Sequence, residues 1–277
     1  MRALLPAAWA LLAAAFLALL LLHRAQARRP GVRTDVASAF FQDLIRYGKT
    51  KRGGGQHAGW LRRLQVPKST EPAILLAEKI MKLTADSERF SALLVLLLLW
   101  LHSFQRLAEC LYTSVFSNGV IHIVQYCFGI GYYIAVGSTV LCQVPTNARN
   151  GQELSVQILW YHIVGIVMYI WASLHQHRCL VILANLRKSK SGKVLSLNHS
   201  IPFGDWFERV SCPHYFAELL IYISMAITFG FHNVTWWFVV MYVFFNQALA
   251  AVLCHEFYQE KFTSYPKHRK AFVPFIF

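Results

Sequence analysis

Long apolar runs alternate with polar segments along most of this chain. A run of about 20 apolar residues is long enough for a helix to span the hydrocarbon core of a bilayer. The runs cover residues 3–22, 90–101, 120–142, 154–174, 215–231 and 235–254. Only His232, Asn233 and Val234 separate the last two, which predicts a tight hairpin at one membrane face. The pattern predicts an all-α fold, a transmembrane bundle of about six to seven helices.

Composition supports an integral membrane protein. Hydrophobic residues make up 56% of the chain and charged residues 14%, with a mean hydropathy of +0.40. The net charge of +14 is not accompanied by a basic helix or a stacking module, which argues against nucleic acid as a partner. No glycine-rich phosphate motif follows a strand, so a soluble nucleotide-binding domain is excluded. The six cysteines are scattered without metal-like spacing, and we expect reduced packing residues and no metal site.

The first run leaves two interpretations open. Ala25-Gln26-Ala27 after it offers a signal-peptidase site, as in a cleaved signal peptide. The run is longer than an ordinary signal-peptide core, which favours a retained signal-anchor span over residues 1–22.

Cations concentrate in two connections and at the C-terminus. Residues 23–68 and 175–214 are both strongly basic, and the positive-inside rule places both, with the C-terminal tail, in the cytosol. Two segments on the same side must be separated by an even number of crossings, yet only three apolar runs lie between residues 68 and 175. The only other candidate, Pro72–Leu83, is too short and too polar to span alone. Either one orientation is wrong, or the chain lacks a span at about residues 69–88.

Several ionisable groups lie at or near membrane depth. His102, Arg106 and Glu109 are spaced by four and three residues, so they share one helix face. Such a face is a candidate functional site, because burying charge in a membrane is costly, although Arg–Glu at this spacing is often only a structural ion pair. Single polar residues in other runs are more often contacts between helices than ligands; they are Gln125, His162, Glu218, Asn246 and Gln247.

The last 23 residues interleave aromatic residues with His, Lys and Arg. On composition alone they are typical of a juxtamembrane anchor. They also contain the donors and rings that bind phosphates and flat aromatic groups, which predicts a tail that folds back to complete a site. The basic segment 175–214 suits phosphates for the same reason. His175 and Cys179 within it do not have the spacing of a zinc site.

Together these segments resemble the steroid 5-alpha-reductase family, and within it the branch that acts on polyprenols. The resemblance covers roughly residues 40–68 and 88–277. The family motifs are matched by Arg187-Lys188, by Ile-Pro-Phe-Gly-Asp-Trp-Phe at 201–207, by Glu218 and by the tail 255–277. Residues 41–49 and the run from Glu109 to Asn118 resemble the polyprenol branch in particular.

The resemblance implies a multi-pass enzyme of the endoplasmic reticulum membrane. It implies reduction of the α-isoprene double bond of long-chain polyprenal or polyprenol to the dolichol series, in support of protein N-glycosylation. It implies residues 1–22 as an anchor, 23–89 as a basic loop with a replaced span, and 90–277 as a reductase domain that binds NADPH from the cytosol. Its implied partners are a polyisoprenoid substrate and bilayer lipids. The implied NADPH contacts are Lys49, Arg106, Asn118, Arg187, Lys188, His199, Asp205, Glu218, His255, Tyr258, Tyr265, Arg269 and Lys270.

This chain departs from the family pattern at several positions. The apolar span expected after Lys68 is replaced, Ser200 stands for a usual Arg, and His214 for a frequent Asn. Ser103 stands where the steroid enzymes have a tyrosine, which argues against a 3-oxo-Δ4 steroid as the substrate. Two more hypotheses are an S-adenosylmethionine-dependent membrane methyltransferase, whose expected tail pattern is missing, and a catalytically inactive splice isoform.

Hydride transfer to a carbon–carbon double bond requires a place for negative charge, which a conjugated carbonyl provides as an enolate. We therefore expect polyprenal, not polyprenol, to be the species reduced. The candidate donors to the carbonyl oxygen are His102 and Tyr47, with Glu109 holding one of them or Arg106. Five aromatic residues are candidates for the path of the lipid tail: Phe116, Phe128, Tyr132, Trp236 and Trp237.

Overall fold

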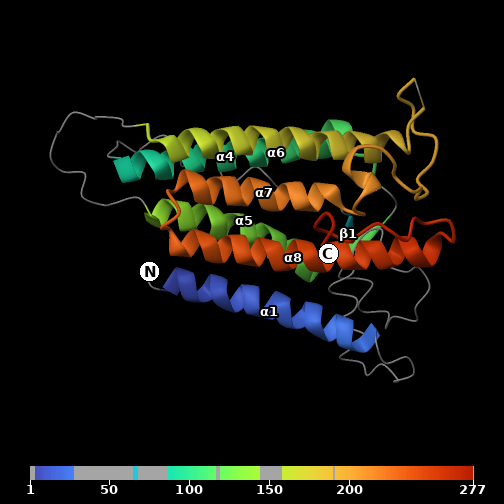
Figure 1. Cartoon of the computed structure of the whole chain (residues 1–277), viewed down its shortest axis with the longest axis horizontal. Helices are drawn as coiled ribbons and strands as arrows, with labels where there is room; N and C mark the ends of the chain where they lie inside the picture. The colour runs from blue at the N-terminus through green and yellow to red at the C-terminus, as the bar shows by residue number, and fades with distance from the viewer. Residues whose placement is uncertain are drawn as a thin grey trace.

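The structure is a computed structural model that describes residues 4–27, 65–67, 87–116, 119–143, 158–189 and 191–276. Six helices of 16 residues or more run side by side along one direction in this part of the chain (Figure 1). They are α1 (Leu4–Ala27), α4 (Ser87–Ala108), α5 (Ile123–Gln143), α6 (Trp160–Asn185), α7 (Pro213–Thr228) and α8 (Val234–Lys261). A π-helical turn η4 (Glu109–Thr113), a 3-10 turn η5 (Asp205–Glu208) and the strands β1 (Gln65–Pro67) and β2 (Val120–His122) complete the described elements. The predicted all-α membrane bundle is confirmed.

Among the described residues, five stretches are long and apolar enough to cross a membrane: Leu5–Arg24, Phe90–Thr113, Ile123–Gln143, Trp160–Asn185 and Val234–Lys261. The predicted span at 215–231 is instead the 16-residue helix α7, which at 1.5 Å per residue is about 24 Å long. The hydrocarbon core is about 30 Å thick, so α7 does not cross it alone. Most residues of α7 are buried among the other helices of the bundle.

Two helices continue well beyond the apolar runs that predicted them. α6 extends to Asn185 and α8 to Lys261, so residues 175–185 are helical and not loop, and the tail begins after Lys261. Neither extension contains the Gly or Pro that would stop a helix. Hydropathy marks where the lipid ends, whereas backbone hydrogen bonding decides where the helix ends. The His, Gln and Arg side chains at these helix ends therefore lie on rigid elements.

The N-terminal helix α1 is an integral part of the bundle. It packs along α8, and the indole Nε1 of Trp9 donates a 3.0 Å hydrogen bond to Oγ1 of Thr139 in α5. At its other end, Nε2 of His23 lies 2.8 Å from Oε2 of Glu256 in α8. Trp9 is 2% exposed and contacts the Tyr242 ring. Retention of α1 as an anchor stays a prediction.

The described parts of the basic segments lie at one end of the bundle. The His23–Glu256 contact places the end of α1 beside the end of α8, and β1 pairs with β2 at the start of α5, with Pro67 opposite Val120. Helix α4 begins at the other end, at Ser87 (Figure 1). Pro67 and Ser87 therefore lie at opposite ends of the bundle.

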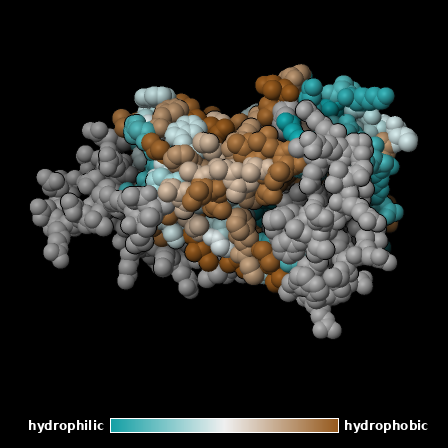
Figure 2. All heavy atoms as spheres, turned by 90° about the horizontal axis from the view of Figure 1, so that it is seen from below, coloured by the Kyte–Doolittle hydropathy of each residue, from teal (hydrophilic) through white to brown (hydrophobic). Residues whose placement is uncertain are grey.

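The segment after α8 turns back over the same end of the bundle. The Phe272 ring packs 6.0 Å from Phe216 at the start of α7 and 5.9 Å from Phe244 in α8. Backbone bonds join it to the segment before α7, with Ser211 N donating to Lys270 O at 2.8 Å. The middle of the bundle is predominantly hydrophobic on the face shown in Figure 2, and hydrophilic residues gather at this end. The predicted fold-back of the tail is confirmed.

Candidate functional site

A cavity of about 590 Å³ lies between the helices. It extends along α8 from Tyr242 to Tyr258, which is about 24 Å at 1.5 Å per residue. Its apolar wall includes Phe16, Leu19, Phe128, Tyr132, Tyr242 and Val243. Its polar wall includes Arg106, Gln176, Arg187, His199, Tyr215, Glu218 and Tyr258. One elongated cavity thus combines a charged part with a part suited to hydrocarbon.

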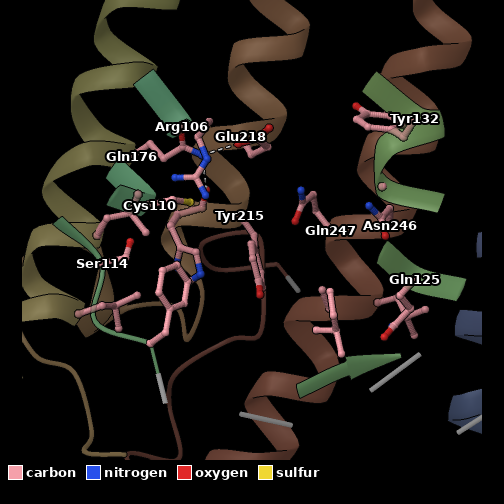
Figure 3. A pocket seen from close by; sticks show the side chains of 18 of the residues that line it. Arg106, Cys110, Ser114, Gln125, Tyr132, Gln176, Tyr215, Glu218, Asn246 and Gln247 are labelled. Atoms are coloured by element: carbon pink, nitrogen blue, oxygen red, sulfur yellow. Dashed lines mark hydrogen bonds between the residues drawn. The ribbon is translucent and has the colours of Figure 1, made fainter. Parts of the chain in front are cut away.

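Glu218 of α7 faces this cavity, and its carboxylate contacts side chains of α4 and α6. Its Oε1 lies 3.0 Å from Nε2 of His102 in α4, and its Oε2 accepts a 2.5 Å hydrogen bond from Nε2 of Gln176 in α6. Arg106 lines the cavity beside it (Figure 3). The His102 side chain is fully buried and that of Glu218 is 14% exposed. His102 therefore acts on the cavity through Glu218, and a direct contact between His102 and a substrate stays a prediction.

Glu109 forms a second buried carboxylate centre in the turn η4. Nη1 of Arg106 donates to it at 2.6 Å, and Nε2 of Gln105 at 3.0 Å. Nδ1 of His177 in α6 lies 3.0 Å from the same carboxylate. Glu109 is 3% exposed, and it does not line the cavity. The predicted common face of Arg106 and Glu109 is confirmed, and its effect is to orient Arg106.

The two adjacent cations after α6 hold the end of η4. Arg187 donates to the carbonyl of Val115, and Nζ of Lys188 donates to the carbonyl of Thr113 at 2.9 Å. Burial lowers the pKa of Arg187 below its usual value, and a guanidinium remains charged at neutral pH even so. Arg187 also lines the cavity, together with His199. Positive charge is therefore fixed at the end of the cavity next to the basic segments.

The tail residues are organised by Ser211. Its Oγ lies 2.6 Å from Nδ1 of His255 and 2.6 Å from the hydroxyl of Tyr265. Tyr265 stacks on Tyr258 with a 5.5 Å separation between ring centroids, and Tyr258 lines the cavity. Burial is the main cause that raises the pKa of Tyr265, so its phenol is neutral. Ser211 thus links the tail to the cavity wall.

The remaining predicted contacts are placed away from the cavity surface. Arg269 is 2% exposed and donates to the carbonyl of Pro202 at 2.8 Å, and Oδ2 of Asp205 lies 3.6 Å from Nδ1 of His175. The Lys270 side chain is exposed. None of Arg269, Asp205 and Lys270 lines the cavity. In this conformation they support the segments that carry cavity residues.

Some sequence predictions fall elsewhere. Tyr47, Lys49 and Asn118 lie outside the described residues. Phe116, Phe128 and Tyr132 line the cavity as predicted for a lipid path. Trp236 does not, because it is fully buried in the core and donates to the carbonyl of Tyr222, and Trp237 donates to the carbonyl of Phe231 in the α7–α8 turn.

Sequence reasoning missed Gln176, Tyr215 and Ser211 as members of the site. Apolarity ends at Leu174 and so predicts a loop at Gln176, although the helical register of α6 would have placed this residue on the buried face. Ser211 carries no signal in the sequence, since its role follows from the fold-back of the tail.

The site suits a nicotinamide coenzyme together with an apolar substrate. Fixed cations at one end match phosphates, and Arg106, Gln176 and Glu218 lie deeper, where a carboxamide or a reacting carbonyl finds hydrogen-bond partners. Oε1 of Gln125 is buried without a hydrogen-bond partner among the described residues. Buried polar atoms of this kind ordinarily have partners, which a bound ligand can supply.

Comparison with known proteins identifies the family of the chain. The family model of 3-oxo-5-alpha-steroid 4-dehydrogenase matches residues 120–277. The polyprenal reductase of Xenopus tropicalis is 52% identical, with 99% of each chain covered. Those of Ailuropoda melanoleuca and Homo sapiens are 52% and 51% identical, with 99% of this chain and 96% of each relative covered. The chain therefore belongs to the steroid 5-alpha-reductase family of oxidoreductases acting on CH–CH groups, in the branch that contains the polyprenal reductases.

Proposed function

We propose that this protein reduces the α,β double bond of a long-chain polyprenal with NADPH, as a step toward dolichol. The observation that carries the proposal is the cavity itself. Its polar wall, with Arg106, Gln176 and Glu218, continues into an aromatic and apolar wall that includes Phe128 and Tyr132. A compact polar reactant would leave that apolar wall uncovered, whereas an aldehyde on a hydrocarbon tail matches both parts.

The coenzyme would enter from the basic end. Arg187 and His199 would contact its phosphates and Tyr258 would pack against a ring, since each of these three lines the cavity. NADPH in place of NADH is favoured by the excess of Lys and Arg at this end. Bound there, the coenzyme supplies a hydride. By the positive-inside rule this end is cytosolic, in the endoplasmic reticulum membrane, with the C-terminus on the same side.

The residues of this chain would supply the proton. His102 and Glu218 form the buried acid–base pair nearest the polar wall, at 3.0 Å. A pair that shares one proton can release it to the carbon next to the carbonyl and regain it from water. Gln176 fixes the carboxylate, and Glu109 fixes Arg106. Tyr47 stays a second candidate donor that lies outside the described residues.

The relatives also bear on the replaced segment. The alignment with the Xenopus tropicalis protein runs over 309 positions, and this chain has 277 residues, so at least 32 positions face a gap in this chain. This is consistent with a span that the relatives have and this chain lacks. A direct assay must therefore test whether the chain turns over.

The test is an NADPH-dependent reductase assay on membranes that contain this chain. Polyprenal, polyprenol and a 3-oxo-Δ4 steroid are offered in parallel, with a full-length relative as the positive control. We expect reduction of the α,β double bond of polyprenal, and no reduction of polyprenol or of the steroid. Reduction of the steroid in preference to polyprenal would refute the substrate, and an inactive chain beside an active relative would identify a catalytically dead isoform.

A Glu218→Gln variant tests the proton source, because the amide keeps the shape and cannot share the proton with His102. We expect a loss of kcat of about 10²–10⁴-fold, the usual contribution of general acid–base catalysis. Gln143→Leu serves as the control, since Gln143 contacts Asn233 at the other end of the bundle. Unchanged kcat in Glu218→Gln would remove the pair from the mechanism.

A further inference from the structure

Three side-chain amides face the cavity from α5 and α8. Gln125, Asn246 and Gln247 all line it. In Figure 3 they lie on one side, with Arg106 and Glu218 on the other. Their neighbours on α8 along the wall are Tyr242 and Val243 on one side and Leu249 and Ala250 on the other. The amides are thus a polar patch within an otherwise apolar wall.

Nothing in the described residues uses these amides. Oε1 of Gln125 is buried and has no hydrogen-bond partner there. The side chains of Asn246 and Gln247 form no hydrogen bond with another described side chain or backbone group. Amides that join helices bond to each other or to backbone groups, as Asn233 does with Gln143 at 2.9 Å. Polar groups at half-buried positions without such partners are available to a ligand.

The chemistry of the amides selects the ligand group. An amide N–H₂ donates hydrogen bonds without adding charge, and amide donors are used elsewhere to stabilise an oxygen that becomes negative during a reaction. Glu218 cannot serve this oxygen, because a carboxylate accepts but does not donate, and Nη1 of Arg106 already donates to Glu109. His102 is fully buried behind Glu218. Among the described residues, the amides are therefore donors that face the cavity and are not committed elsewhere.

We propose that Asn246 and Gln247, supported by Gln125, bind the carbonyl oxygen of the substrate and stabilise the enolate formed from it. This proposal rests on the proposed reduction of a polyprenal. Hydride adds to the β-carbon, the carbon–carbon π electrons move to join the α-carbon to the carbonyl carbon, and the carbonyl π electrons move to oxygen. The amide N–H groups hold this oxygen. A proton then adds to the α-carbon, and the carbonyl re-forms.

The arrangement explains how charge is distributed across the cavity. The oxygen that gains negative charge is held on the side of α8, away from the Glu218 carboxylate, which would repel it. The proton source lies on the opposite side, from which a proton can reach the α-carbon. The tail of the substrate then continues along the aromatic wall formed by Tyr132 and Tyr242.

The test compares Asn246→Leu, Gln247→Met and the double variant with the parent chain. Each replacement keeps the approximate volume and removes the donor. Gln143→Met is the matched control, an amide of α5 outside the cavity. One readout is the infrared carbonyl stretch of bound polyprenal labelled with carbon-13 at the carbonyl, measured without NADPH. The second is kcat, with the KM for NADPH measured beside it.

We expect the carbonyl band to lie at lower frequency in the parent and in Gln143→Met than in the double variant, where it moves toward its value in an apolar solvent. We expect kcat to fall about 10²–10³-fold on removal of a donor, with an unchanged KM for NADPH. A carbonyl band that is the same in the parent and the double variant overturns the proposal, as does failure of the aldehyde to bind.

The infrared readout separates this proposal from the proposed function. A band that shifts with the amides in a chain without turnover would refute the reductase activity and leave the carbonyl site in place. Turnover of polyprenal with kcat unaffected by the amides would retain the reductase activity and refute the carbonyl site.

Discussion

Replacement of Gly165 by alanine is expected to separate the two helices that hold Glu218 and Gln176. A Cβ atom at Gly165 of α6 would overlap Oγ1 of Thr228 and lie 2.9 Å from the backbone carbonyl oxygen of Ser224, both in α7. Because one of the two obstacles is backbone, rotation of a side chain cannot relieve the contact. The helices must move apart, and the hydrogen bond from Gln176 to Glu218 lies on the same pair of helices.

The magnitude follows from two opposing effects. Alanine favours a helix over glycine by about 1 kcal/mol. Overpacking of a filled interface costs about 1–3 kcal/mol, and contacts this short place Gly165 at the upper end. We therefore expect a net loss of about 1–2 kcal/mol in the free energy of unfolding, together with a lower kcat.

Thermal unfolding in detergent measures the first effect and the reductase assay the second. Gly131→Ala in α5 is the matched control, because a Cβ atom there meets nothing within 4 Å. The control should equal or exceed the parent in stability. If Gly165→Ala is as stable and as active as Gly131→Ala, close packing of α6 on α7 does not position Glu218.

Three further predictions concern the end of the bundle that carries the cations. His23→Ala should lower the stability by about 0.5–1.5 kcal/mol, because it removes the contact with Glu256, and limited proteolysis should then release α1 more readily; an unchanged digest would contradict the role of that contact. Burial raises the pKa of Tyr265 above 10.0. The stabilisation by its neutral phenol is therefore complete below about pH 10 and is lost as the pH rises through the raised pKa. Alkaline unfolding should occur at higher pH in Tyr265→Phe than in the parent, and an identical pH profile of unfolding would contradict this. Asn198 should carry no sugar when the chain is made in microsomes, since its segment lies at the basic end. A mobility shift on glycosidase treatment would show that this end faces the lumen. Asn233 should also stay unmodified, because its side chain accepts a hydrogen bond from Trp236 N and donates one to Gln143.

The fold could be predicted from the chain to the extent that hydropathy decides it. Apolar runs marked all six described helices, since burial in lipid requires a nearly continuous apolar surface. They misplaced the ends of α6 and α8 by 11 and 7 residues, respectively, relative to Leu174 and Cys254. A helix continues wherever its backbone bonds are made, and hydropathy does not report that.

The site was less predictable because its members are far apart in the sequence. The pairing of His102 with Glu218 joins residues 116 positions apart, and no local pattern specifies it. The resemblance to a family identified Glu218, Arg187 and Tyr258, all of which line the cavity. It also included Arg269, which donates to the carbonyl of Pro202 and does not line the cavity, so its contact with a coenzyme stays a prediction.

The extension of α6 and α8 beyond the lipid joins two environments that treat charge differently. Within the stretches able to cross the membrane, an ionisable group must be paired to be tolerated, as Glu109 in Phe90–Thr113 is by Arg106 and His177. Beyond them, water solvates cations, which remain able to bind phosphates. Because α6 continues to Asn185 and α8 to Lys261, each helix carries residues both in the membrane and at the aqueous end of the bundle. Cavity residues on or next to these two helices can then hold a coenzyme and a lipid aldehyde in fixed register, although one reactant arrives from water and the other from the bilayer. These residues are Gln176 of α6, Arg187 just after α6, and Gln247 and Tyr258 of α8.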